Sequence, residues 1–200
     1  MNRIFTTRQQ RLATRAADGL PRWRWTVPEI EKMALDGYFR EDEQFELVGG
    51  EIVPMSPKGR RHEIIRTALA FHLTKQAPDG VFVAAETQFN LDDDTYLTPD
   101  ILVHPAGVPS PDVRSADALL VIEVADASLH YDMNIKAPMY ATYDLRELWV
   151  IDAATLTTMM HRRPAGKAWY SVAEAAPGTT LTSTLVPALS VSLTALNLKL

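Results

Sequence analysis

Two short apolar runs, one directly preceded by an acidic residue and one containing an acidic residue, constrain the fold of this chain most. Residues 101–104 (ILVH) and 118–125 (ALLVIEVA) are rich in aliphatic side chains and predict buried strands, and the Pro-, Gly- and Ser-rich segment between them predicts a turn. If the strands pair as an antiparallel hairpin about residues 110–112, Asp100 and Glu123 lie side by side. Side-chain alternation then places Glu123 among apolar neighbours.

Acidic side chains in such positions need a compensating partner, because burying a charge costs several kcal/mol unless it is paired or bound to a cation. Two carboxylates that converge repel each other unless a metal ion lies between them. Mg²⁺ takes oxygen ligands and keeps waters that can become a nucleophile, as a hydrolase requires. A structural alternative stays open, in which Glu123 pairs with an arginine and Asp100 caps a turn after Pro99.

The order of the motifs resembles a known nuclease family. Pro99-Asp100, followed after a hairpin by Glu123-Val124-Ala125, resembles the PD-(D/E)xK nuclease signature, and the surrounding sequence resembles its Uma-type branch, a bacterial family described as restriction endonucleases. The resemblance covers about residues 26–195. Its matching segments are FELVGGEIVPMSP at 45–57, His62, TPDILV at 98–103, LVIEVADAS at 120–128, Asp132 with Lys136 and Tyr140, and LRELWVID at 145–152.

This resemblance implies an α/β fold of the restriction-endonuclease type, with a mixed central β-sheet flanked by α-helices. It also implies a hydrolase, a Mg²⁺- or Mn²⁺-dependent endonuclease that cleaves DNA. Asp100, Glu123 and the Val124 carbonyl would ligate the metal. His62 would approach the acidic pair, although a lone helical histidine is also explained as a hydrogen-bonded core residue. Two alternatives stay open: a non-catalytic binding or scaffold descendant of the fold, and a hydrolase of small phosphoesters.

The lysine of the general signature is displaced in this sequence. That signature has a lysine two residues after the glutamate, where this chain has Ala125. The Uma-type resemblance points instead to Lys136, which would stabilise charge on the attacked phosphate or assist the water. Pro138 interrupts the helical pattern, so Lys136 is expected near the entry of a helix. A solvent-facing lysine is the alternative.

The clustered acids also predict a linkage between metal and protons. In the absence of metal, two neighbouring carboxylates should raise each other's proton affinity. Metal binding should then release protons and become tighter as the pH rises.

Composition predicts a single domain preceded by a basic arm. The chain has 200 residues, 46% of them hydrophobic, which is enough for one packed domain over residues 26–200. It has no cysteine and no apolar run long enough to span a membrane, so we expect a cytoplasmic protein, and a homodimer stays open. The net charge of −5 disfavours non-specific attraction to DNA. Residues 1–25, however, hold six arginines and one acid, an arm that could contact nucleic acid, cap another subunit or form a tail.

Local patterns predict most of the remaining elements. A helix should begin at Thr26, with Glu29 completing a capping box. Glu46 should lie on the exposed face of its strand. The other predicted elements are a hairpin at Gly49-Gly50, a helix over residues 59–76, a strand over 81–91, a strand over 148–152 and a hairpin around Ala165-Gly166.

Overall fold

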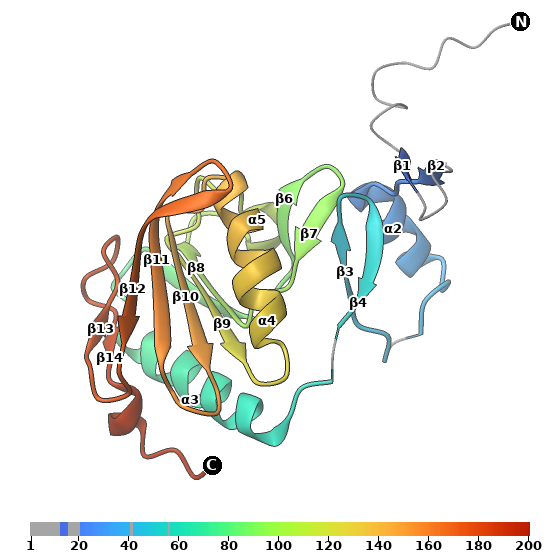
Figure 1. The fold of residues 1–200 in the computed structure, drawn as a ribbon. Helices are drawn as coiled ribbons and strands as arrows, with labels where there is room; N and C mark the ends of the chain where they lie inside the picture. The colour runs from blue at the N-terminus through green and yellow to red at the C-terminus, as the bar shows by residue number, and fades with distance from the viewer. Residues whose placement is uncertain (1–12, 16–20, 41, 56) are drawn as a thin grey trace, which may run out of the picture. The chain divides into compact units, whose positions relative to one another are not determined.

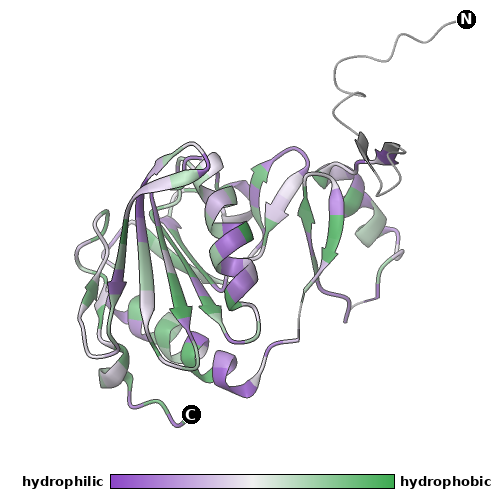
Figure 2. Cartoon of the chain, in the orientation of Figure 1, coloured by the Kyte–Doolittle hydropathy of each residue, from purple (hydrophilic) through white to green (hydrophobic). Residues whose placement is uncertain are grey.

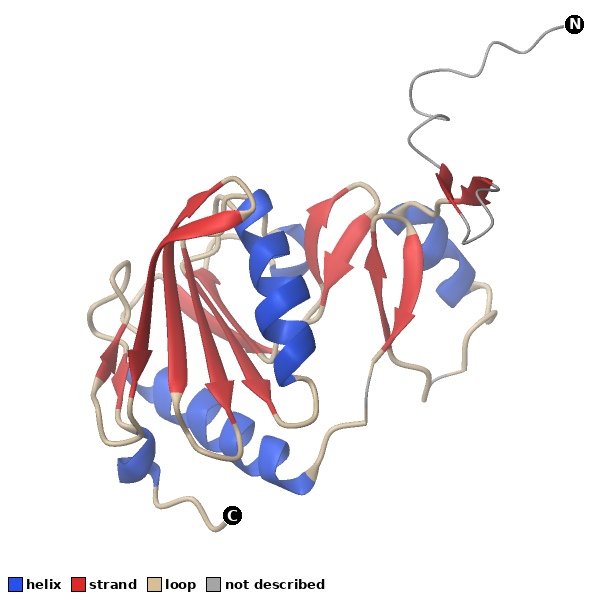
Figure 3. Cartoon of the chain, viewed as in Figure 1, coloured by secondary structure: helices blue, strands red, loops and turns tan. Residues whose placement is uncertain are grey.

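The computed structural model describes residues 13–15, 21–40, 42–55 and 57–200. Contacts divide the chain into two compact units, Met1–Met55 with Asn90–Leu97, and Ser56–Phe89 with Thr98–Leu200. Each unit combines helices with a β-sheet (Figure 3). Among the described helices, none has the length and apolar character of a membrane span. Most of the predicted basic arm lies outside the described residues, so its role stays a prediction.

The described part of the smaller unit contains one helix and a four-stranded sheet. Helix α2 (Val27–Leu35) begins where predicted, because Thr26 and Glu29 form the expected capping box. The sheet has the strand order β4-β3-β7-β6. Its strands are β3 (Phe45–Val48), β4 (Glu51–Pro54), β6 (Phe89–Asp92) and β7 (Thr95–Leu97), and a separate pair is formed by β1 (Ala13–Arg15) and β2 (Pro21–Trp23).

The β3–β4 hairpin confirms one prediction and corrects another. Gly49 and Gly50 both have positive φ, 56° and 79°, as a tight two-residue hairpin turn requires. The expectation that Glu46 is exposed is wrong, because only 2% of its surface is accessible. Alternation along a strand identifies the face that a residue occupies, but not whether other parts of the protein cover that face. β3 lies between β4 and β7, so it is an interior strand of this sheet and not an edge strand.

The larger unit is a mixed six-stranded sheet, as predicted, with helices packed on it (Figure 1). Its order is β12-β11-β10-β9-β8-β5, and all neighbouring strands are antiparallel except β9 and β10. The strands are β5 (Val81–Ala85), β8 (Ile101–Pro105), β9 (Leu120–Ala125), β10 (Glu147–Asp152), β11 (Thr158–Ala165) and β12 (Ala168–Ala175). Short elements complete the unit: β13 (Leu181–Thr182), β14 (Ser190–Val191) and the 3₁₀ segments η1 (Ser110–Asp112) and η3 (Leu193–Leu196).

Different helices pack on the two faces of the central strands. Ile122 and Val124 of β9 share an apolar core with Ile65 and Leu69 of α3 (Arg60–Gln76). Glu123 lies between these two strand residues and therefore points to the opposite face. That face carries the crossover between the parallel strands β9 and β10, formed by α4 (Leu129–Tyr131), the π-helical segment η2 (Asp132–Lys136) and α5 (Ala137–Thr142). Figure 2 shows hydrophobic residues along the central strands and a hydrophilic first turn of α3.

The predicted hairpin that carries the two acids is confirmed. β8 and β9 are antiparallel, with Ile101 opposite Ile122, so the register brings Asp100 opposite Glu123. The segment between the strands turns through η1, at the residues where the turn was expected. Asp100 thus lies directly before β8, and Glu123 lies in β9 beside the point where the pairing of β8 with β9 stops.

One predicted strand is broken in the structure. The run expected as a single strand over residues 81–91 forms β5 and β6, which are separated by residues 86–88. Glu86 has a positive φ of 51°, which ends the extended backbone. Its main-chain N–H donates to the Asp100 carbonyl at 3.2 Å, so this turn lies beside the acidic pair.

Candidate nuclease site

Asp100 is a buried carboxylate that accepts hydrogen bonds from three directions. Its Oδ2 accepts from the Val124 N–H at 2.8 Å, and its Oδ1 lies 2.9 Å from His62 Nε2 and 3.3 Å from Lys58 Nζ. Burial alone would raise the pKa of Asp100, but the hydrogen bond and charge of His62, the Val124 N–H and the Lys58 ammonium together lower it. Asp100 is therefore held as an anion.

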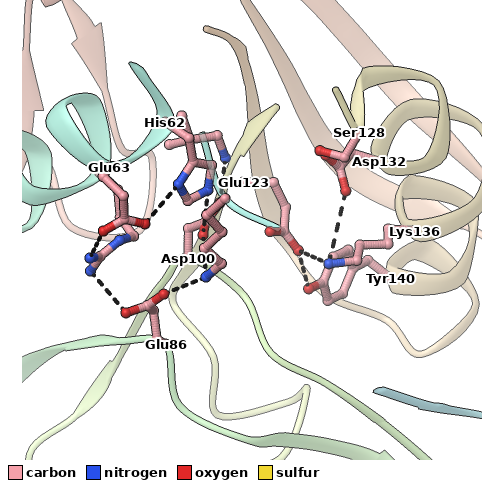
Figure 4. Close-up of polar contacts among 12 residues, drawn as sticks. His62, Glu63, Glu86, Asp100, Glu123, Ser128, Asp132, Lys136 and Tyr140 are labelled. Carbon is pink, nitrogen blue, oxygen red and sulfur yellow. Dashed lines mark hydrogen bonds and ion pairs between the residues drawn. The ribbon is translucent and has the colours of Figure 1, made fainter. Parts of the chain in front are cut away.

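Glu123 has a separate set of partners on the crossover (Figure 4). Its Oε1 accepts from Lys136 Nζ at 3.2 Å and from the Tyr140 hydroxyl at 2.8 Å. Lys136 Nζ also lies 3.9 Å from Asp132 Oδ1, and all of these groups are buried. The lysine that the resemblance identified thus reaches the glutamate from the following helix, as predicted.

The π-helical segment explains how Lys136 obtains this position. Pro138 has no N–H and its ring would clash with the carbonyl four residues earlier in a regular α-helix. The chain avoids that clash by widening for one turn, so that the Ala137 N–H donates to the Asp132 carbonyl, five residues back. Lys136 is the last residue of the widened turn and has helical φ and ψ, −67° and −46°, so it lies inside a continuous helical run over residues 129–142 and not, as was expected, near a helix entry.

His62 lies near the start of α3 and links Asp100 to the helix. Besides the contact with Asp100, its Nδ1 lies 3.1 Å from Glu63 Oε1. Burial lowers the pKa of His62, but the hydrogen bond and charge of Asp100, together with Glu63, raise it above the usual value despite the nearby Lys58. The structure thus brings His62 to the acidic pair, where it acts as a hydrogen-bonding partner of Asp100.

Three residues that sequence analysis did not identify complete the surroundings of Asp100. Lys58, in the loop before α3, contacts both Asp100 and Glu86. Arg66 lies 2.6 Å from Glu63 and 3.3 Å from Glu86. The Glu63–Arg66 spacing of three residues on a helix indicates such a pair. No local pattern links Lys58 to Glu86, which are 28 residues apart.

One sequence-based expectation about the acids is wrong. The two carboxylates were expected to raise each other's proton affinity, but the pKa of Asp100 is lowered. Each acid has cationic or hydrogen-bonding partners of its own, His62 and Lys58 for Asp100 and Lys136 for Glu123. Against the effect of burial, the pKa of Asp100 is lowered by His62, the Val124 N–H and Lys58.

The donor atoms at the hairpin end suit a hard divalent cation. Asp100 and Glu123 supply carboxylate oxygens. In a β-strand the N–H and C=O of one residue point to the same side, so the Val124 carbonyl is on the side of the strand on which its N–H meets Asp100. Within the described ranges no three His, Asp or Glu side chains form a metal-binding group. A cation here would therefore complete its shell with main-chain, water or phosphate oxygens.

Comparison with known proteins agrees with this fold. A solved structure to which the chain is similar is the crystal structure of a putative nuclease belonging to DUF820 from Anabaena variabilis, with a TM-score of 0.64 at 15% identity, covering 86% of this chain and 96% of that chain. Curated proteins give no significant match. The sequence matches the Uma2 family, described as putative restriction endonuclease, over residues 27–196. Because this match spans most of the sequence, the chain belongs to the Uma2 family.

Proposed function

We propose that this protein is a Mg²⁺- or Mn²⁺-dependent endonuclease that hydrolyses phosphodiester bonds in DNA. The observation that carries the proposal is the register of β8 and β9, which brings Asp100 opposite Glu123 at the point where strand pairing ends. Lys136 contacts Glu123 from the crossover and supplies a positive charge at the same place. Membership of a family described as restriction endonucleases supports a nucleic-acid substrate.

Asp100, Glu123 and the Val124 carbonyl would hold the metal, because they provide the oxygen ligands that Mg²⁺ and Mn²⁺ prefer. When bound, such an ion lowers the pKa of a water and neutralises charge on a phosphate. Val124 and His62 orient the Asp100 carboxylate through hydrogen bonds. These fixed contacts limit the rearrangement that ligand binding requires.

Lys136 and Tyr140 hold Glu123 on the opposite side of the site. The Lys136 ammonium is buried and lies between Glu123 and Asp132, so its position is well defined. In this setting it would stabilise the negative charge that develops on the attacked phosphate. Because the protein environment excludes much of the water, this stabilisation would be stronger than that of an exposed lysine.

The experiment is cleavage of supercoiled plasmid with Mg²⁺ or Mn²⁺ by the wild type, Asp100→Ala and Asp112→Ala. Asp112 is an exposed aspartate in the turn of the same hairpin, so it controls for the loss of one acid. We expect nicked and linear plasmid from the wild type and Asp112→Ala, and at least about a hundredfold slower cleavage by Asp100→Ala.

Two outcomes would favour other functions. A wild type that binds plasmid but neither cleaves it nor binds Mn²⁺ would indicate a non-catalytic descendant of the fold. Hydrolysis of small phosphoesters, with no cleavage of plasmid, would indicate a phosphoesterase. Equal cleavage by the wild type and Asp100→Ala would reject the site itself.

A further inference from the structure

Asp100 and five other ionisable side chains form a closed ring in which acidic and basic residues alternate (Figure 4). In order, the ring runs Asp100, His62, Glu63, Arg66, Glu86, Lys58 and back to Asp100. Each contact is 3.3 Å or shorter. The ring includes one of the two acids proposed to bind metal, and therefore ties that acid to groups with no ligand role.

Lys58 is the ring member that would compete with a metal ion for the Asp100 carboxylate. Its ammonium contacts Asp100 Oδ1 and Glu86 Oε1, and its side chain is 17% exposed. Lys136 has the equivalent relation to Glu123, but it lies on a helix and is more deeply buried. Each proposed metal-binding acid thus has its own lysine, and only Lys58 is on a loop.

We propose that Lys58 is a built-in counter-ion of Asp100, which a divalent cation must displace before it can bind. This inference rests on the proposed function, because it concerns metal binding at the same acids. In the metal-free protein the Lys58 ammonium neutralises Asp100. When a divalent cation enters, Lys58 moves away from Asp100 and stays attached to Glu86.

Electrostatics requires this competition. A lysine ammonium and a divalent cation that share one carboxylate repel each other strongly in a buried site, where water screens charges poorly. Lys58 has two carboxylate contacts, one with Asp100 and one with Glu86, and only Asp100 would be shared with the cation. Movement of the Lys58 side chain away from Asp100 relieves the repulsion.

Glu86 provides the second anchor that such a movement needs. Its carboxylate joins Lys58 on one oxygen and Arg66 on the other. Its backbone has a positive φ, which is costly for a residue other than glycine, and its N–H donates to the Asp100 carbonyl. These contacts hold Glu86 beside Asp100, so a displaced Lys58 keeps a partner.

The test is isothermal titration calorimetry with Mn²⁺ on the wild type, Lys58→Met and Arg61→Met. Lys58→Met removes the charge and keeps most of the side-chain length. Arg61 is an exposed cation three residues along the chain, so Arg61→Met controls for the change in net charge. We expect Lys58→Met to bind Mn²⁺ at least about tenfold more tightly than the wild type, and Arg61→Met to bind with less than about a threefold change.

A second pair of variants tests the anchor and does not depend on the folding of Lys58→Met. Glu86→Gln and Glu63→Gln each remove one negative charge from the ring, but only Glu86→Gln removes the alternative partner of Lys58. We therefore expect Glu86→Gln to weaken Mn²⁺ binding clearly more than Glu63→Gln does. Equal weakening by the two variants would contradict the role of Glu86 as anchor.

The pattern of results separates this inference from the proposed function. Equal Mn²⁺ affinity in the wild type and Lys58→Met, with binding lost in Asp100→Ala, would overturn the role of Lys58 and leave the metal site standing. Binding that Asp100→Ala does not change would reject the metal site itself. Failure of every protein, Lys58→Met included, to bind millimolar Mn²⁺ would reject both.

Discussion

At the scale of single residues, the position of Lys136, the lysine proposed to be catalytic, differs from that of the lysine in the general PD-(D/E)xK pattern. Ala125 follows Glu123 by two residues on the same strand face and is completely buried. Lys136 reaches Glu123 from the crossover, at 3.2 Å. The ammonium is thus present at the glutamate although the residue that carries it lies 13 positions away.

This geometry predicts different results for the lysine and the aspartate. Lys136→Ala should lower the turnover of plasmid cleavage by at least about a hundredfold, because it removes charge stabilisation in the transition state. It should not weaken Mn²⁺ binding, since an ammonium is no metal ligand and its positive charge repels the cation. Asp100→Ala should lose both. Turnover from cleavage kinetics and affinity from calorimetry would distinguish these two patterns.

The double variant Lys136→Ala with Ala125→Lys supplies the matched control. It returns an ammonium to the face of Glu123, at the position of the general pattern, and we expect it to recover part of the lost cleavage. The single variant Ala125→Lys measures how much cleavage is lost because a larger side chain is placed at this buried position. Equal cleavage by the wild type and Lys136→Ala would end the account of a displaced lysine.

Sequence patterns predicted the two acids but not all of their partners. Asp100 and Glu123 could be predicted as neighbours because strand alternation and the midpoint of a hairpin are local rules, and the register of β8 and β9 confirms the hairpin. Lys136 and His62 came from a family resemblance. Lys58 and Glu86 meet only because a break between two strands brings Glu86 beside Asp100, and no periodicity in the sequence encodes that contact.

At the scale of elements, the break after β5 and the widened turn η2 are two features that local sequence patterns did not predict. The sequence VFVAAETQFNL has the composition of one strand, yet the chain turns at Glu86 with a positive φ. Hydrogen bonding and ion pairs with other segments select that conformation, against its local cost. Pro138 did indicate an irregular helix, but not that a π-helical turn would accommodate it.

Glu147 is a buried acid on β10 that links this strand to the segment after β13 by hydrogen bonds. Its carboxylate accepts hydrogen bonds from five donors: Trp149 Nε1, Arg162 Nε, Ser183 Oγ, and the Thr184 N–H and hydroxyl. The pairing of Glu147 with Arg162 also lies directly across β10 and β11. These donors saturate the carboxylate, which identifies a structural role.

Glu147→Gln should therefore destabilise the fold by about 2 kcal/mol or more, because the amide nitrogen faces donors and the charge opposite Arg162 is lost. The free energy of unfolding in urea measures this effect. Glu174→Gln, at an exposed position of β12, is the matched control and should change the same quantity by less than about 0.5 kcal/mol. Equal effects of the two variants would contradict the structural role of Glu147.

At the scale of the whole molecule, charge is distributed unevenly along the chain. The net charge is −5, yet residues 1–25 contain six arginines and one acid. Arg24, the last of these arginines, pairs with Asp94 at 2.7 Å within the smaller unit. Residues 1–20 hold four of the arginines and one aspartate, so their deletion moves the net charge from −5 to −8.

Deletion of residues 1–20 tests whether this arm contacts nucleic acid. Each phosphate contact contributes about 0.9 to the slope of log affinity against log salt, so an arm that binds DNA through its four arginines would flatten that slope by up to about 4. We expect weaker binding to a DNA duplex and a flatter slope, both measured by fluorescence anisotropy in Ca²⁺. An unchanged slope with a changed molar mass in light scattering would assign the arm to contacts between subunits. If neither quantity changes, the arm is a tail, and recognition of DNA then depends on cations of the site itself, among them Lys58 and Lys136.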